Sequence, residues 1–309
     1  MERKTNRKTI NFRTALVFCI TFIITIIFIC FLNQSQVKEE KMKATYTAEA
    51  TVNRIESQMN QYLVASDFMK NIVEAGYEIG DREYAAMCSL LQDDEHIIEA
   101  FELARDGTVS QVYPLEGNEE AIGLDMLTHP QRKKEAKLAM DSGQYTIAGP
   151  FELVQGGTGA LLFDPIYIED SSGNKGFWGF SLLVLNWDKF VDKLNLDSLE
   201  EAGYHYQIWK HNMSTDKDVT IARCDDLNEK FAIEVACQVP NDTWYVEIAP
   251  EYGWISNNII WGYFFFAIAF TCLVSVGYWQ FEQQRYKEYV YARKIEETPG
   301  KTRLANQGK

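Results

Sequence analysis

Two uncharged apolar runs set the strongest limit on what this chain of 309 residues can fold into. They cover residues 15–32 (ALVFCITFIITIIFICFL) and residues 258–279 (NIIWGYFFFAIAFTCLVSVGYW). Each approaches the ~20 apolar residues that a helix needs to cross a bilayer. The first run has no small-residue cleavage site, which favours an uncleaved anchor over a signal peptide. The sequence therefore predicts a two-pass membrane protein with transmembrane helices at 15–32 and 258–279.

Charge on either side of the two runs predicts their orientation. Residues 1–14 carry five Lys or Arg against one acid, and residues 281–309 carry seven against four. Because positive flanks stay on the cytoplasmic side, we expect an N-terminus (1–14) and a short tail (280–309) in the cytoplasm of a plasma or inner membrane. The segment between the runs would lie outside, and its 18 basic and 39 acidic residues exclude a nucleic-acid partner.

The outer segment begins with a stretch that contains neither Pro nor Gly. Apolar residues recur there at steps of three and four, at Val52, Ile55, Met59, Tyr62, Met69 and Ile72. This spacing predicts a long amphipathic helix, close to a coiled-coil seam at its centre. The helix is compatible both with packing along its own domain and with a stalk in a homodimer.

Antiparallel strands are predicted after this helix and a second helix at 81–91. The first strands run over 97–105 and 108–113, joined at Asp106-Gly107, a strong hairpin signal. A helix at 130–141, which Gly143 would cap in a left-handed conformation, and strands at 145–148, 151–155, 159–168 and 176–186 follow. Short helices at 187–194 and 197–202 precede strands at 204–210, 219–223, 230–239 and 243–249.

This order predicts an α+β fold with a long N-terminal stalk helix, a PAS-like antiparallel-sheet domain and a second, smaller antiparallel sheet, flanked by the two transmembrane helices. The outer segment would span 37–250: a stalk helix (37–80), a distal domain (81–186) and a membrane-proximal domain (187–250). Cys224 and Cys237 could face each other across a hairpin and form a disulfide, which this compartment would allow. Spacing alone does not place their α-carbons, so free thiols stay an alternative.

The stretch 112–168 carries a series of ordered clusters: Tyr113-Pro114, 117–119 (GNE), 122–125 (IGLD), His129-Pro130 with Arg132, Ser142-Gly143, Gly149-Pro150, 153–157 (LVQGG) and 164–167 (DPIY). In these clusters it resembles the CHASE family of extracytoplasmic sensor domains of membrane receptors. The resemblance implies tandem PAS-like antiparallel-sheet domains after the stalk helix, in a receptor input module that binds a small ligand in its distal domain and transmits a signal across the membrane.

The resemblance also implies which residues line the ligand pocket. The matching positions are Met126, Ala148 and Val154, which would supply apolar wall, Phe163, which would shrink the cavity, and Arg132, preceded by Asp125. In cytokinin-binding members an acidic side chain stands where this chain has Arg132, so adenine-type ligands are disfavoured. A cavity-facing Arg132 would favour a small carboxylate, which a guanidinium binds bidentately. The alternative is a surface salt bridge from Arg132 to Asp125 or Glu135.

No nucleophile–base pair, metal cage or cofactor motif stands out, so we predict neither an enzyme nor a cofactor. The kinase or cyclase that commonly forms the family's output is not in this chain. The chain would therefore have lost its output, be part of a longer receptor, or signal through a separate cytoplasmic protein. Two alternatives remain. One is a membrane-anchored scaffold without ligand, in which Met126, Leu161 and Phe163 would pack together. The other is an outer-face enzyme, which would place strongly shifted pKa values in a cleft.

Overall fold

The computed structural model describes residues 7–153, 156–169, 172–212, 217–224 and 226–297. The chain divides into two units, Met42–Glu251 and the two terminal stretches Met1–Lys41 and Tyr252–Lys309. Helix α1 (Arg7–Glu74) runs from the first terminal stretch into the larger unit. It contains no Gly or Pro, and it ends where Gly76 adopts a left-handed conformation with φ of 80°.

The terminal unit is helical. It holds the start of α1 and helix α6 (Asn257–Glu297). Each helix contains an 18-residue window apolar and uncharged enough to cross a membrane, and little of either window is buried. Such exposure is unlike that of a core helix in a soluble domain. Tyr263 donates a hydrogen bond to Oε1 of Gln36 at 2.9 Å inside this unit.

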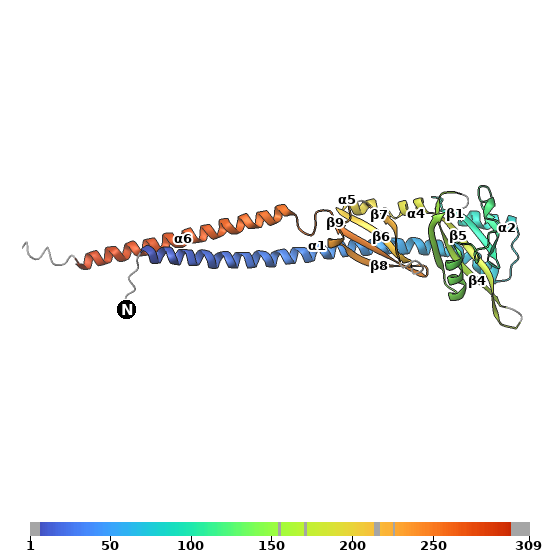
Figure 1. Ribbon diagram of the computed structural model, residues 1–309, viewed down its shortest axis with the longest axis horizontal. Helices are drawn as coiled ribbons and strands as arrows, with labels where there is room; N and C mark the ends of the chain where they lie inside the picture. The colour runs from blue at the N-terminus through green and yellow to red at the C-terminus, as the bar shows by residue number, and fades with distance from the viewer. Residues whose placement is uncertain (1–6, 154–155, 170–171, 213–216, 225, 298–309) are drawn as a thin grey trace, which may run out of the picture. The chain divides into compact units, whose positions relative to one another are not determined.

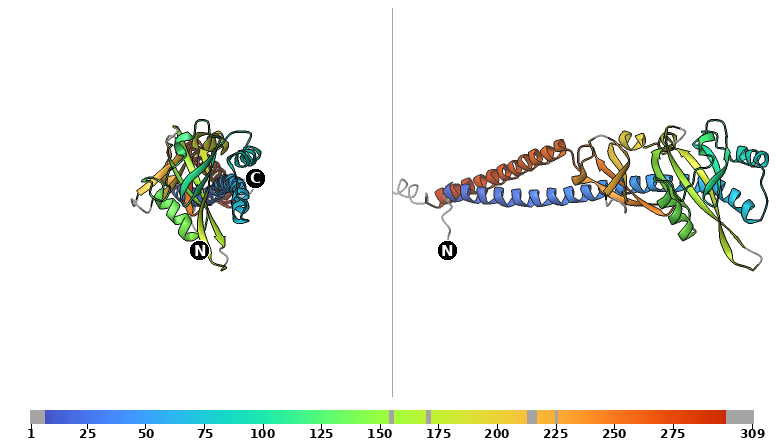
Figure 2. Two further views of the ribbon diagram at one scale, coloured as in Figure 1. Left: turned by 90° about the vertical axis from the view of Figure 1, so that its right-hand side faces the viewer. Right: turned by 45° about the vertical axis from the view of Figure 1, so that its right-hand side comes forward.

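The larger unit is α+β, with two antiparallel sheets beside the second half of α1 (Figures 1 and 2). The five-stranded sheet has the order β2-β1-β5-β4-β3 and the four-stranded sheet the order β7-β6-β9-β8. The strands of the first are β1 (Ile98–Arg105), β2 (Thr108–Tyr113), β3 (Thr146–Glu152), β4 (Thr158–Glu169) and β5 (Lys175–Asn186). Those of the second are β6 (Tyr204–Asn212), β7 (Lys217–Arg223), β8 (Ile233–Val239) and β9 (Asp242–Pro250).

Shorter helices fill the connections. They are α2 (Asp81–Leu91), the 3₁₀ turn η1 (Glu119–Ala121), α3 (Lys133–Ser142), α4 (Trp187–Lys193), α5 (Asp197–Glu201) and the 3₁₀ turn η2 (Glu229–Phe231). Helix α3 ends at Gly143, whose φ of 69° confirms the predicted left-handed cap. The turn at Asp106-Gly107 has positive φ at both residues, as the hairpin prediction required.

The apolar seam of α1 packs against both sheets of its own chain. Val52, Ile55, Met59, Tyr62 and Met69 are all buried, as the periodicity predicted, whereas Ile72 is only partly buried and Val73 is buried beside it. Polar contacts fix the same helix: Oε1 of Glu56 accepts from the backbone N–H of Gln238 in β8, and Ser66 contacts Asp164 in β4. The coiled-coil-like spacing therefore serves packing within the chain.

Two details of the predicted strands are wrong. Gly149-Pro150 does not separate two strands, because β3 continues through it with a shift of register against β4 between Ala148 and Phe151. Cys224 and Cys237 do not face each other across a hairpin. Cys224 follows β7 and Cys237 lies in β8, strands that form opposite edges of the four-stranded sheet with β6 and β9 between them, and the two thiols are not joined in a disulfide.

Candidate ligand-binding site

One face of the five-stranded sheet forms a buried apolar layer together with α3 and the loop before it. Strand pairing aligns residues of this face into a row, in which Val112, Glu102, Leu182 and Phe163 are successive cross-strand neighbours. Ala136 and Ala139 from α3 and Met126 from the loop complete the layer. A single carboxylate, that of Glu102, therefore stands within an otherwise apolar row.

Arg132 enters this layer from the turn that begins α3. It is the N-cap residue of that helix and only 3% exposed. Its Nη1 lies 3.9 Å from Sδ of Met126, and its guanidinium lies 5.4 Å from the ring centroid of Phe151. No ion pair joins Arg132 to Asp125 or Glu135 within the described ranges, so the surface salt-bridge alternative is wrong.

The buried pair Arg132 and Glu102 is electrostatically coupled. Burial raises the pKa of Glu102 to about 7, and the positive charge of Arg132 opposes that rise. Burial also lowers the pKa of Arg132, against the effect of Glu102. Removing both charges from water is expensive, and an attraction between them compensates only when their remaining donors and acceptors are matched.

In the pair Arg132 and Glu102, the remaining hydrogen-bond donors and acceptors are not matched. Among the residues that the structure describes, nothing hydrogen-bonds Nε of Arg132 or Oε2 of Glu102, although both atoms are buried. Buried polar atoms normally have a partner, and those that lack one need an explanation. Here one donor and one acceptor, on oppositely charged groups in the same layer, both have unused hydrogen-bonding capacity.

The predicted pocket residues fall into three groups. Met126, Ala148 and Phe163 belong to the buried layer, with Arg132 beside them. Asp125 turns away: its Oδ1 accepts from the backbone N–H of Leu127 at 2.9 Å and its Oδ2 from Thr128 at 2.7 Å, a local turn that also lowers its pKa. Val154 lies outside the described residues. Leu161 packs in the same layer as Met126 and Phe163, the arrangement expected for the scaffold alternative.

Glu102 was missed by sequence reasoning. It sits in the strand sequence IEAFELAR, where alternation places Ala100, Glu102 and Ala104 on one face. An acid between two alanines on the inward face of a strand was the available signal. It was not distinctive, because strand periodicity alone does not say which face of an edge-adjacent strand is buried.

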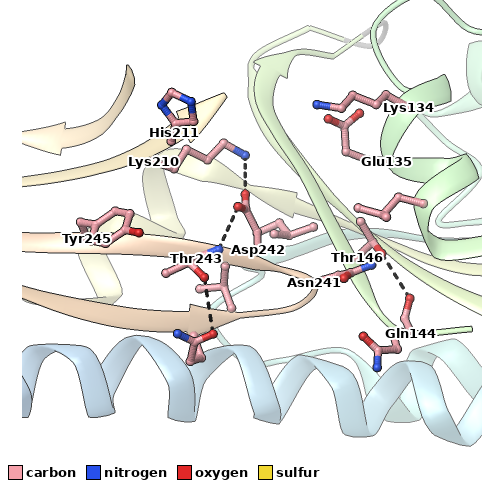
Figure 3. Close-up of a pocket in the computed structure, with 14 residues that line it drawn as sticks. Lys134, Glu135, Gln144, Thr146, Lys210, His211, Asn241, Asp242, Thr243 and Tyr245 are labelled. Atoms are coloured by element: carbon pink, nitrogen blue, oxygen red, sulfur yellow. Dashed lines mark hydrogen bonds and ion pairs between the residues drawn. The ribbon is translucent and has the colours of Figure 1, made fainter. Parts of the chain in front are cut away.

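A cleft of about 770 Å³ opens where the two sheets meet (Figure 3). Lys134 and Glu135 of α3 line one side, and Lys210, His211 and Asp242 line the other. Lys210 is paired with Asp242 at 3.0 Å. The described part of the chain contains no group of three His, Cys, Asp or Glu residues placed to hold a metal ion.

The tip of the β8–β9 hairpin closes one end of this junction. The carbonyl of Pro240 accepts from the backbone N–H of Ile147 at 3.0 Å, and Nδ2 of Asn241 donates to Oγ1 of Thr146 at 3.0 Å and to Oγ of Ser142 at 3.1 Å. The hairpin thus binds the end of α3 and the start of β3, and both elements also contribute to the buried layer.

Comparison with known proteins places this arrangement among sensor domains. Residues 48–220 match the family described as the CHASE domain. This is more than half of the chain, so the chain belongs to the CHASE domain family, which confirms the resemblance found in its motifs. The domains of this family are sensor input modules that bind ligands.

Similar solved structures include an extracellular ligand-binding receptor from Desulfohalobium retbaense, with a TM-score of 0.50 and 14% identity. The match covers 65% of this chain and 39% of the receptor chain, and at this identity it shows a shared fold. The periplasmic domain of Vibrio cholerae LuxQ (TM-score 0.37, 11% identity, 66% and 98% covered) and methyl-accepting chemotaxis protein X (0.40, 11%, 71% and 98%) are weaker likenesses. A comparison with curated proteins gave no match.

Proposed function

We propose that this protein is a membrane-bound extracytoplasmic sensor that binds a small carboxylate in the layer around Arg132 and transmits the binding event across the membrane. The observation that carries the proposal is the nearly complete burial of Arg132 with its Nε unmatched. A buried guanidinium with an N–H that has no acceptor is a ready site for a carboxylate. Met126, Ala148 and Phe163 would form the apolar wall. We also assign Val154 to this wall, on the family resemblance alone.

The two apolar helical windows support the membrane part of the proposal. We assign 15–32 and 258–279 to the spans, 1–14 and 280–309 to the cytoplasm, and 37–250 to the outer side. Within the outer segment, residues 37–80 form the stalk, whose helix ends at Glu74, and we assign 81–186 and 187–250 to tandem PAS-like domains. The antiparallel order of each sheet and the pairing of β1 with β5 support this division.

Transmission would run through the hairpin tip. Because Pro240 and Asn241 contact β3 and α3, a ligand that moves α3 changes the position of the hairpin. Strand β9 follows this tip, and it ends at Pro250, a few residues before α6 begins. A ligand with different affinities for two positions of α3 would shift the equilibrium between them by that difference.

We further propose that two copies of the chain pair through the stalk. The apolar side chains Met42, Tyr46, Val64 and Phe68 are exposed on α1, away from its buried seam. A second copy of the helix would cover them. Oxidation of Val64→Cys in membranes should join two chains by a disulfide, and Ser57→Cys, at another exposed position of α1, serves as the comparison. If no disulfide forms at either position, the dimer is contradicted. We also propose that a separate cytoplasmic output protein binds the dimer and responds to its change of conformation.

A scaffold without ligand is the second candidate, because Met126, Leu161 and Phe163 pack in one layer. A thermal-shift screen of the full chain in detergent against small carboxylates, purines and peptides separates the two. The sensor proposal predicts a concentration-dependent rise in melting temperature with a carboxylate. The rise is lost in Arg132→Ala and kept in Lys133→Ala, its exposed neighbour. A well-folded protein that no compound stabilises supports the scaffold.

A further inference from the structure

Glu102 determines the charge that a ligand beside Arg132 meets. Its side chain is 2% exposed, and its flanking residues on the same face of β1 are Ala100 and Ala104. Among the described residues, Arg132 at the start of α3 and Tyr84 from α2 interact electrostatically with it, and the buried thiol of Cys88 in α2 hydrogen-bonds Tyr84. Burial raises the pKa of Tyr84 well above its usual value, so that phenol is neutral and Arg132 is the cation of the site.

This composition sets a condition on any anionic ligand. With Glu102 ionised, the buried pair has no net charge, and a ligand carboxylate would add an uncompensated negative charge to an apolar layer. Burial of an uncompensated charge is strongly disfavoured. With Glu102 protonated, the site carries one positive charge, and the two unmatched atoms become two donors, Nε–H of Arg132 and O–H on Oε2 of Glu102.

We propose that this site binds a small monocarboxylate together with one proton, and that Glu102 holds the proton in the complex. The inference rests on the proposed function and adds its ligand class and its dependence on pH. On binding, one proton passes from solvent to Oε2 of Glu102, and on release it returns. No covalent bond changes in the ligand. A dicarboxylate is excluded because Arg132 balances a single negative charge.

The direction of the pH effect follows from this balance. The pKa of Glu102 is raised to about 7 before ligand binds. Below that pH the proton is already present, and affinity for the carboxylate is constant. Above it the proton must be taken up, so the dissociation constant rises about tenfold for each unit of pH.

Isothermal titration calorimetry on the full chain in detergent tests the inference with acetate, propionate, butyrate and benzoate as probes. Titrations at pH 5.5 to 8.5 in phosphate and in Tris, whose ionisation enthalpies differ, report the protons taken up. The expected result is uptake that approaches one proton at pH 8 and disappears near pH 5.5. Glu102→Gln should bind with a dissociation constant that does not change with pH, because its amide donates at every pH.

The matched control is Glu99→Gln, a substitution on the same strand but on its opposite face, which should retain the pH dependence of the unaltered protein. If a monocarboxylate binds the unaltered protein without proton uptake at any pH, the inference is wrong and the sensor function stands. If no carboxylate binds to folded protein, both fall. Neither outcome depends on whether Glu102→Gln folds.

Discussion

The two faces of the five-stranded sheet both bury a carboxylate, and they treat it in opposite ways. On the face toward α1, Oδ1 of Asp164 is paired with Nζ of Lys70 at 2.9 Å and its Oδ2 accepts from Ser66 at 3.3 Å. Ser66 also hydrogen-bonds Oγ of Ser181, the cross-strand neighbour of Asp164. On the other face, Glu102 has a buried oxygen without a partner within the described part of the chain.

Burial has a similar effect on the acidity of the two groups. It raises the pKa of Asp164 to about 6 and that of Glu102 to about 7. The difference lies in how their hydrogen bonds are matched. A matched network holds α1 in one position on the sheet, whereas an unmatched pair costs stability and gains nothing in the free protein. That cost is typical of a binding site, in which the ligand supplies the missing partners.

Breaking the matched face should have the largest effect on stability. Asp164→Ala leaves the buried end of Lys70 without its carboxylate and removes one of the two hydrogen-bond partners of Ser66, and we expect a loss of about 3 kcal/mol in the free energy of unfolding. Urea denaturation followed by circular dichroism measures it. Asp192→Ala, at an exposed position in α4, should change stability by less than about 0.5 kcal/mol. If the two variants lose the same stability, the hydrogen bonds and ion pair of Asp164 do not stabilise the fold, and the distinction between the two faces is wrong.

Glu102→Gln should increase the stability of the protein, whereas Asp164→Ala lowers it. The folded protein holds the proton of Glu102 up to a pKa of about 7, above the usual 4.5, so this residue lowers stability as pH rises from about 4.5 to 7. The glutamine variant should therefore be more stable than the unaltered protein by roughly 3 kcal/mol at pH 8. Below about pH 4 the two should be equal. Unfolding measured across this range gives both values, and a variant that is less stable at pH 8 would show that the carboxylate is matched.

A smaller effect is expected at the connection between the site and β9. Asn241→Ala removes two hydrogen bonds from the hairpin tip to Ser142 and Thr146, at a cost of about 1 kcal/mol. Ligand affinity should stay within a few-fold, while the ligand-induced change at the hairpin becomes smaller. Fluorescence of a probe attached at Gln238→Cys, measured with and without ligand, reports that change. A response equal to that of the unaltered hairpin would place the transmission route elsewhere.

Periodicity and local signals predicted much of this fold. The apolar spacing of Ile55, Met59 and Tyr62 located the buried side of α1, and Asp106-Gly107 located the first hairpin, because both depend on neighbours in the sequence. The pairing of β6 with β9 was beyond such reasoning, since it joins strands far apart in the chain, and the expected approach of Cys224 to Cys237 was wrong for that reason.

The site was predictable only in part. The motif match indicated Arg132, whose burial the sequence left open because a helix start can face either way. Glu102 escaped notice because its importance comes from a partner thirty residues away and from hydrogen bonds that it does not make. Such an unmatched pair becomes visible once the strands place both groups in one layer.

The central claim is that the unmatched face binds the ligand and the matched face does not. Calorimetric titration of a monocarboxylate into the unaltered chain, Arg132→Lys and Asp164→Asn tests it most directly. Lysine keeps the charge but lacks the Nε–H of the guanidinium fork, so we expect its dissociation constant to rise at least tenfold. Asp164→Asn should stay within about threefold of the unaltered protein. Equal affinity in all three proteins would contradict the account.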